Sequence, residues 1–298
     1  MLDITGKRSW FFIISGVVIL IGIISLVTFG LKLGIDFSSG SIMTLRFEQQ
    51  GATNAELRQE LASLGYGNAV VQTTGDGNVL IRTTELTTEE KGQLKENLAA
   101  KFGPVDERGF EAVDPVIARQ TARAAAIAVA IAAVGILLYI TWAFRRMPHP
   151  FRYGTCAIIA LAHDVLLVLG TFSILGGLLG WEINLMFITG ILAVIGYSVN
   201  NTVVVFDRIR ENLSKGISPH FEVVVNSSLI ETISRSLNTS LTTLLVVLAL
   251  LLFVGATIIN FAVVLLIGII AGTFSSICIA PLLLVLWEKR RARHLARA

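Results

Sequence analysis

Polar side chains interrupt the apolar segment from Gly190 to Asn212, whose sequence is GILAVIGYSVNNTVVVFDRIREN. The amides Asn200 and Asn201 lie near its centre, and a charged cluster ends it. Polar groups at membrane depth are costly unless they face a partner or a water-filled path. At about 100° per residue, Tyr197 and Asn201 share one helix face, and Arg208 returns close to it. We expect that face to point into a helix bundle.

A polar stripe opens the next apolar segment. Its spacing of i, i+3, i+4 and i+7 places four residues on one helix face. They are Arg235, Asn238, Thr239 and Thr242. Hydrogen bonds to a neighbouring helix are one interpretation of this stripe, and a functional role inside the bundle remains open beside it. For Arg235, snorkelling to the membrane interface is a further alternative.

Two further features lie inside apolar segments. His163 and Asp164 are adjacent, and they form either a structural pair or part of a proton relay. Near the C-terminus, small side chains recur every four residues, at Gly268, Gly272, Ser276 and Ala280. This ladder predicts a close helix-packing face.

Several kinds of active site are absent from the sequence. It contains no metal-binding spacing, no nucleophile elbow and no Gly-rich phosphate loop followed by Lys, and its four histidines are widely scattered. We therefore expect neither an enzyme nor a metal site nor an organic cofactor.

The composition is that of a membrane protein. Hydrophobic residues make up 54% of the 298 positions, charged residues only 15%, and the mean hydropathy is +0.74. Soluble domains are usually about a quarter charged. Cys156 and Cys278 both lie in apolar segments, so we expect buried, inert thiols rather than a disulfide framework.

Six apolar segments are long enough to cross a bilayer. They cover about residues 10–31, 122–143, 154–176, 184–206, 237–254 and 261–287. The first could instead be a cleaved signal peptide, but its apolar region is too long and no small-residue cleavage site follows it. We expect a retained first span.

The segment between the first two spans has the composition of a soluble domain. Residues 32–119 hold 13 of the 21 acidic residues and 9 of the 24 basic ones, a net charge of about −4. Strands are expected at 41–47, 69–74, 79–84 and 105–113, and helices at 54–64 and 88–102, capped by Asn54 and Thr88. A hairpin turn is expected at 75–78. The order βαββαβ is that of a ferredoxin-like α+β domain.

The charged linkers predict the orientation in the membrane. The linkers 144–153 and 207–236, with both termini, carry 14 Lys and Arg, whereas the short linkers at 176–182 and 255–260 carry none. By the positive-inside rule, both termini are expected in the cytoplasm and the soluble domain outside. The basic tail predicts a topology signal and contact with anionic lipid, and no nucleic acid partner is expected.

Four motifs resemble the SecF family, whose members form the smaller subunit of the bacterial SecD–SecF accessory of the Sec translocase. They are GIDFSSG at 34–40, ALAHDV at 160–165, VIGYSVNNTVVVFDRIREN at 194–212 and SRSLNTSLTTL at 234–244. The resemblance covers essentially the whole chain, and the SecD–SecF pair is itself related to the resistance-nodulation-division (RND) transporters. It implies a bacterial inner-membrane protein that pairs with SecD, acts at the SecYEG translocon on unfolded preproteins, and uses the proton-motive force, with protons as the coupling ion.

One residue departs from the family pattern. The usual fourth-span motif Tyr-Ser-x-Asn-Asp places the presumed proton carrier where this chain has Asn201. An amide has no proton to exchange near neutral pH. A relocated relay, a lost coupling and an engineered change all remain open. Arg235, which matches the family's arginine, is present, and Asn200, Asn201, Arg235, Asn238, Thr239 and Asp164 form the predicted proton path.

The predicted organisation has four parts. They are residues 1–31 with the first span, the external domain 32–119, the five-helix bundle 120–287 and the basic tail 288–298. Gly34, Asp36 and Gly40 form either an exit turn or a hinge for the external domain. A non-conducting scaffold subunit and half of an RND-type small-molecule exporter are the alternative functions.

Overall fold

The protein was analysed as a computed structural model that describes residues 3–48, 52–74, 77–253 and 258–295. The chain forms two compact units, one made of residues 1–32 with 127–298 and the other of residues 33–126. Helix α5 (Pro115–Ala143) begins in the smaller unit and ends in the larger one. Each unit is described separately below.

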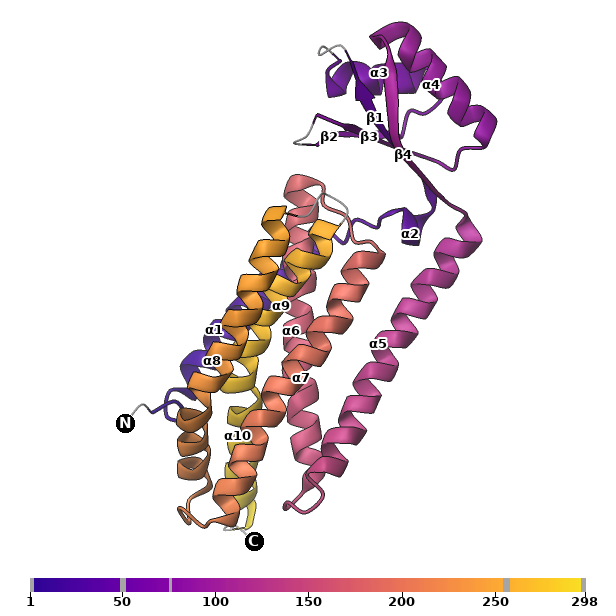
Figure 1. The fold of residues 1–298 in the computed structure, drawn as a ribbon. Helices are drawn as coiled ribbons and strands as arrows, with labels where there is room; N and C mark the ends of the chain where they lie inside the picture. The colour runs from indigo at the N-terminus through magenta and orange to yellow at the C-terminus, as the bar shows by residue number, and fades with distance from the viewer. Residues whose placement is uncertain (1–2, 49–51, 75–76, 254–257, 296–298) are drawn as a thin grey trace. The chain divides into compact units, whose positions relative to one another are not determined.

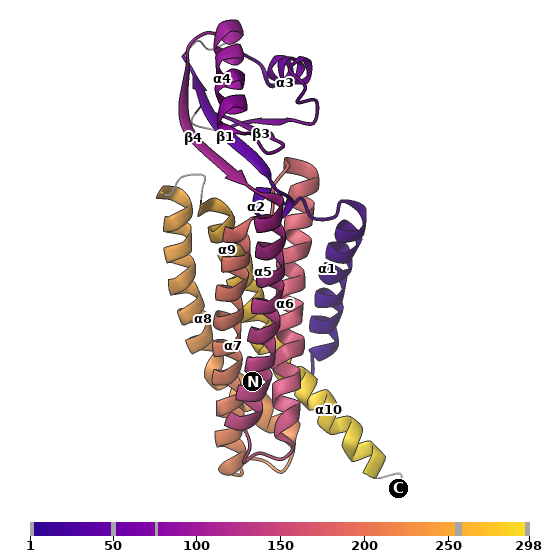
Figure 2. The same cartoon turned by 90° about the vertical axis from the view of Figure 1, so that its right-hand side faces the viewer.

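The larger unit is a bundle of long helices, which Figures 1 and 2 show running side by side. Its helices besides α5 are α1 (Arg8–Thr28), α6 (Pro150–Leu179), α7 (Leu185–Ser214), α8 (Phe221–Phe253), α9 (Ile259–Cys278) and α10 (Ala280–Leu295). Within the described residues, six helical segments are long and apolar enough to cross a membrane, and α9 and α10 count as one of them, from Ile259 to Arg290. The predicted six-span architecture is confirmed.

Two helices extend beyond their apolar cores. Residues 207–236 were expected to be a linker, but α7 continues to Ser214 and α8 begins at Phe221, so that prediction of a linker was wrong over most of its length. Ion pairs along the helix, such as Lys215 Nζ to Glu211 Oε1 at 2.6 Å, stabilise the polar extension of α7. Hydropathy reports where a helix leaves the apolar environment and not where the helix ends.

The sixth span is interrupted at Ile279, between α9 and α10. Pro281 has no N–H with which to continue the hydrogen bonding of α9, and its ring disfavours a straight helix. Figure 2 shows α10 running at an angle to α9. The single apolar segment at 261–287 therefore forms two helices.

The smaller unit is an α+β domain. Its four strands are β1 (Gly40–Phe47), β2 (Val70–Thr73), β3 (Val79–Thr83) and β4 (Val105–Val113), in the antiparallel order β2-β3-β1-β4. Helices α3 (Asn54–Ser63) and α4 (Thr88–Phe102) lie on one face of this sheet (Figure 1). The predicted ferredoxin-like βαββαβ order is confirmed.

Both predicted helix caps in this unit were wrong by one residue. The caps are Thr53 and Thr87, whose hydroxyls accept from the backbone N–H of Glu56 and Glu90 in reciprocal capping boxes. The Thr-x-x-Glu spacing identifies the correct caps in the sequence, and it was not used when Asn54 and Thr88 were predicted. Positions 75 and 76 of the predicted hairpin turn lie outside the described residues. Thr74 N donates to Asn78 O across that turn at 2.8 Å.

Candidate functional site: a buried carboxylate in the helix bundle

A carboxylate lies at the centre of the larger unit. Asp164 on α6 is 0% exposed, and it accepts hydrogen bonds from two neighbouring helices. Oδ2 accepts from Ser198 Oγ on α7 at 2.6 Å and from Ser275 Oγ on α9 at 2.7 Å. Oδ1 lies 2.9 Å from His163 Nδ1. We call His163, Asp164, Ser198 and Ser275 the Asp164 cluster.

His163 gives this cluster a second exchangeable group. Its ring is 5% exposed and stacks on Phe274, with centroids 6.2 Å apart. Its Nε2 has no hydrogen-bond partner among the residues that the structure describes. No Lys or Arg side chain among the described residues pairs with Asp164. The cluster therefore places one imidazole and two hydroxyls around a single buried carboxylate.

Asn201 is buried one helical turn beyond Ser198. It is 3% exposed, and its Nδ2 makes no hydrogen bond within the described chain. Three residues on a helix span about 4.5 Å, so Asn201 and the Asp164 cluster occupy neighbouring levels of the bundle. Asn200 is exposed, whereas Tyr197 is half-buried and donates to Ser240 Oγ on α8 at 3.0 Å. The expectation that this face of α7 points inward holds for Tyr197 and Asn201 in this geometry.

The polar stripe of α8 does not point into the bundle. Arg235, Asn238, Thr239 and Thr242 are all exposed in the isolated chain. Thr239 and Thr242 donate to backbone carbonyls of α8 itself, each at 2.9 Å. The Arg235 side chain makes no hydrogen bond or ion pair within the described residues, and none joins it to Asn201. The buried positions of α8 near this stripe are instead Thr232, Ser236 and Ser240.

The small-residue ladder of α9 lies against α7. A Cβ atom added at Gly268 would overlap the side chain of Val194, and one at Gly272 would lie 2.9 Å from Ser198 Cβ. This close approach lets Ser198 on α7 and Ser275 on α9 reach the same carboxylate oxygen. Ser276 is also buried and donates to Thr273 O at 3.0 Å. The ladder thus positions the Asp164 cluster.

The predicted hinge residues all lie in the smaller unit. Gly34 precedes a four-residue helix, α2 (Ile35–Ser38), which contains Asp36. Gly40 begins β1 with φ of +121°, and a Cβ there would lie 2.5 Å from Thr83 O, so only glycine fits. The segment therefore contains a short helix and not only the turn that the sequence suggested. Its role as a hinge stays a prediction.

The sequence analysis missed two serines that donate to Asp164, because they are far from it in the sequence. Ser198 and Ser275 lie 34 and 111 positions from Asp164. Ser198 could have been found, because it is one turn from Asn201. At the polar end of the bundle, Asn212 Nδ2 donates to Ser228 Oγ at 3.0 Å and to Glu231 Oε2 at 2.8 Å, which joins α7 to α8.

The described residues contain no group of three or more His, Cys, Asp or Glu side chains that could hold a metal ion. The site is instead a hydroxyl-ligated carboxylate beside an imidazole. Fold and site together define a multi-pass membrane protein with a buried polar side-chain cluster at the centre of its helix bundle.

Comparison with known proteins gives the family. The model of "Protein export membrane protein SecD/SecF, C-terminal" matches residues 93–290, and that of the SecD/SecF GG motif matches residues 24–50. The chain belongs to the SecD/SecF family of protein export membrane proteins. It is therefore a transport protein and not an enzyme.

Individual relatives are similar along nearly the whole chain. The protein translocase subunit SecF of Thermobaculum terrenum is 45% identical over 97% of this chain and 95% of its own length. SecF of Anaerolinea thermophila is 42% identical over 99% and 96%.

Longer relatives contain a SecF-like part. SecDF of Bacillus subtilis is 35% identical over 98% of this chain but only 39% of its own length. The crystal structure of SecDF from Thermus thermophilus, described as a translocon-associated membrane protein, matches with a TM-score of 0.84 and 32% identity. That match covers 97% of this chain and 39% of the crystallised one, so this chain spans about two fifths of that protein.

Proposed function

We propose that this chain acts with a separate SecD subunit, at the SecYEG translocon of the bacterial inner membrane, to draw preproteins outward with the proton-motive force. SecF relatives support a role in Sec export. The relatives called SecDF are single longer chains, and this chain matches only 39% of their length. Their name and their additional length support a separate SecD subunit as the partner of this chain. The proton-motive force, the translocon contact and the preprotein substrates are parts of the proposal.

The proposed proton carrier is Asp164 and not position 201. The observation that carries this assignment is a fully buried carboxylate held by hydroxyls from two other helices, beside an imidazole with a free Nε2. Asn201 cannot exchange a proton near neutral pH. Protonation of Asp164 would weaken its hydrogen bonds to Ser198 and Ser275, and α7 and α9 would then repack. One charge moved across 100 mV supplies about 2.3 kcal/mol, which is enough to bias such a two-state change.

The exposed stripe of α8 is the proposed contact with SecD. Arginine and amide side chains facing lipid would be costly at membrane depth, so a partner helix that covers them stabilises the assembly. Arg235 would pair there with a carboxylate of the partner. Under this proposal the Arg235 side chain, which is exposed and does not join Asn201 within the described chain, has its partner on SecD.

We also propose that both termini lie in the cytoplasm and that the α+β domain lies outside. The support is the concentration of Lys and Arg in the termini and two linkers. A cysteine introduced at position 215 should react with a membrane-impermeant thiol reagent only from the cytoplasmic side. Labelling of that position in sealed, right-side-out cells would contradict the proposed orientation.

A non-conducting scaffold is the second candidate function, and Asn201 favours it. In this case the bundle would dock SecD and the translocon without carrying protons itself. The two candidates differ in what Asp164 does.

An export assay with the co-reconstituted SecD subunit separates them. Asp164→Asn keeps the shape and accepts the same hydroxyl hydrogen bonds, but it should abolish gradient-dependent export under the relay proposal. If export with the Asp164→Asn protein depended on the gradient as strongly as export with the unaltered protein, the relay proposal would be contradicted. Under the scaffold proposal the unaltered chain adds no gradient dependence, whereas Asn201→Asp, which places a carboxyl where the family motif has one, creates it.

A further inference from the structure

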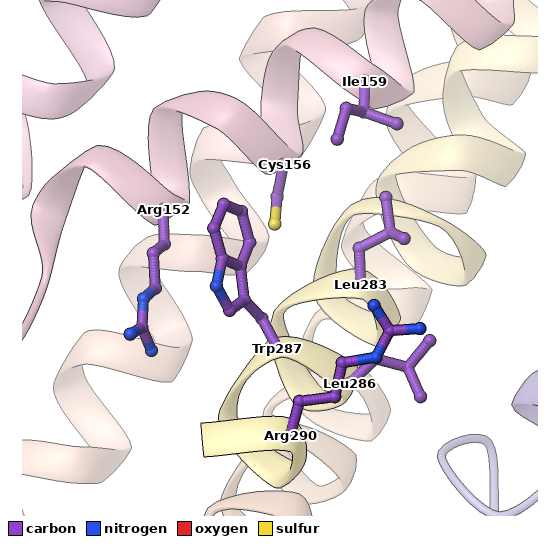
Figure 3. Close-up of a pocket in the computed structure, with 7 residues that line it drawn as sticks. All are labelled: Arg152, Cys156, Ile159, Leu283, Leu286, Trp287 and Arg290. Carbon is purple, nitrogen blue, oxygen red and sulfur yellow. The ribbon is translucent and has the colours of Figure 1, made fainter. Parts of the chain in front are cut away.

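A pocket lies between α6 and α10, away from the Asp164 cluster. It has a volume of about 470 Å³ and is lined by Arg152, Cys156, Ile159, Leu283, Leu286, Trp287 and Arg290. Figure 3 shows Trp287 between the two guanidinium groups, with Ile159 near the far end of the lining. All these residues belong to the larger unit. The pocket therefore combines cations, one indole and an apolar wall.

The two arginines differ in their pairing. Arg152 donates to Glu288 Oε2 at 3.0 Å, and its guanidinium carbon lies 5.6 Å from the centre of the Trp287 ring. Arg290 is exposed and makes no ion pair within the described residues. The adjacent Lys289 is bound to Glu222 and does not line the pocket. The lining therefore has an uncompensated positive charge at Arg290, which is complementary to an anion.

The charged and apolar residues occupy different depths. Arg152 is the third residue of α6, and Arg290 ends the last candidate span. Ile159 and Leu283 each lie seven residues further into their spans, which is about 10 Å along a helix. Trp side chains are enriched where lipid headgroups meet the hydrocarbon. This arrangement matches a molecule with an anionic head and an apolar chain.

We propose that this pocket binds an anionic phospholipid. The headgroup phosphate contacts Arg290 and the free N–H groups of Arg152, and one acyl chain lies along Ile159, Leu283 and Leu286. Basic pockets between membrane helices are known binding sites for anionic lipid headgroups. A soluble phosphate would use the arginines but would leave the apolar wall uncovered, so the lipid accounts for both halves of the lining.

Native mass spectrometry of the purified full chain tests the proposal. The probes are phosphatidylglycerol, phosphatidylcholine with the same acyl chains, and inorganic phosphate. We expect phosphatidylglycerol to bind at least about five-fold more tightly than phosphatidylcholine, because the choline cation offsets the phosphate charge of phosphatidylcholine and repels Arg290. Equal binding of the two lipids, or displacement of phosphatidylglycerol by inorganic phosphate at comparable concentration, would overturn the assignment.

Variants locate the binding within the chain. Arg290→Gln should weaken phosphatidylglycerol binding about five-fold, whereas Arg290→Lys should retain the preference over phosphatidylcholine. Ile159→Trp fills the apolar end without altering charge, and it should weaken binding of the same lipid. The control is Arg146→Gln, which removes an exposed arginine between α5 and α6. An equal loss in Arg146→Gln and Arg290→Gln would show diffuse charge attraction and contradict a defined site.

Discussion

The two units place their polar and apolar side chains in opposite ways. In the α+β unit, ten hydrophobic side chains between Met43 and Leu98 form the buried core. The helix bundle instead exposes apolar residues such as Val27 at 81% and Phe253 at 87%, while Asp164, Ser198 and Ser275 are buried. Water drives burial of apolar area in the first unit. Close packing and hydrogen bonds hold helices together in a membrane, so the bundle can have a polar centre.

This difference explains why the proposed site lies where it does. A buried carboxylate needs hydrogen-bond donors, and in the bundle the donors come from two neighbouring helices. The same contacts that satisfy Asp164 also join α6, α7 and α9. A change in its protonation would therefore act directly on helix packing.

The largest expected effect comes from the apolar core of the α+β unit. We expect residues 36–116 to fold as an isolated fragment, because this core is formed within the unit. Leu45 is fully buried there, so Leu45→Ala should lower the free energy of unfolding by about 2–5 kcal/mol. Denaturant unfolding of the fragment measures this loss.

Two controls accompany this prediction. Val70→Ala changes an exposed side chain of the same sheet and should cost less than about 0.5 kcal/mol. In the bundle, Val27→Ala should leave the melting temperature of the full chain nearly unchanged, because Val27 faces outward. A fragment that does not fold, or a large effect of Val27→Ala, would break the contrast between the units.

Helix packing in the bundle gives the next effect. Gly268→Ala introduces a methyl group against Val194 and should destabilise the full chain by about 1–3 kcal/mol. Gly196→Ala is the matched control, since its Cβ would have no atom within 4 Å. Alanine favours a helix over glycine, so that control should be neutral or stabilising. Thermal unfolding in detergent measures both, and shifts of the same sign would argue against close packing of α7 and α9.

Helix capping distinguishes the structure from the prediction made from sequence. Thr87→Ala removes the side-chain acceptor of the α4 capping box and should cost the fragment about 1 kcal/mol. Thr88→Ala alters the residue that the sequence favoured and should cost less, because Thr88 caps nothing. Parallel denaturant titrations compare the two. A greater loss for Thr88→Ala would restore the sequence-based assignment.

The smallest expected effect is a pH dependence confined to the α+β unit. A hydrogen bond from Lys91 holds the pKa of Glu107 below its ordinary value. Because the folded pKa is the lower one, the stabilisation is present above the ordinary pKa and is lost as the pH falls through the folded value. Glu107→Gln should lower stability at neutral pH by less than about 1 kcal/mol and flatten the acid dependence of the fragment.

Glu111→Gln is the control for that titration. Glu111 is exposed and has no ion pair among the described residues. Its replacement should leave the acid dependence of unfolding unchanged. Equal flattening by both variants would assign the pH dependence to overall charge and not to the Lys91–Glu107 pair.

The sequence predicted elements well and contacts poorly. Periodicity and length identified the six spans, and alternation with turn residues identified the order of the α+β domain. Burial inside a membrane helix depends on its neighbours, so apolar runs could not show that the stripe at Arg235 faces outward while Ser236 is buried. The pairing of Ser275 with Asp164 depends on how α9 crosses the bundle, and its local sequence does not specify that crossing.

Proton exchange at Asp164 is the central claim, and infrared spectroscopy tests it most directly. The carbonyl band of a protonated carboxyl, assigned by its absence in Asp164→Asn, should change in intensity when a proton gradient is imposed across vesicles that contain the reconstituted protein. His163→Gln should alter the size of that change, because it removes the neighbouring exchangeable group. An Asp164 band that stays constant under the gradient, or a change that is unaffected by His163→Gln, would contradict the account.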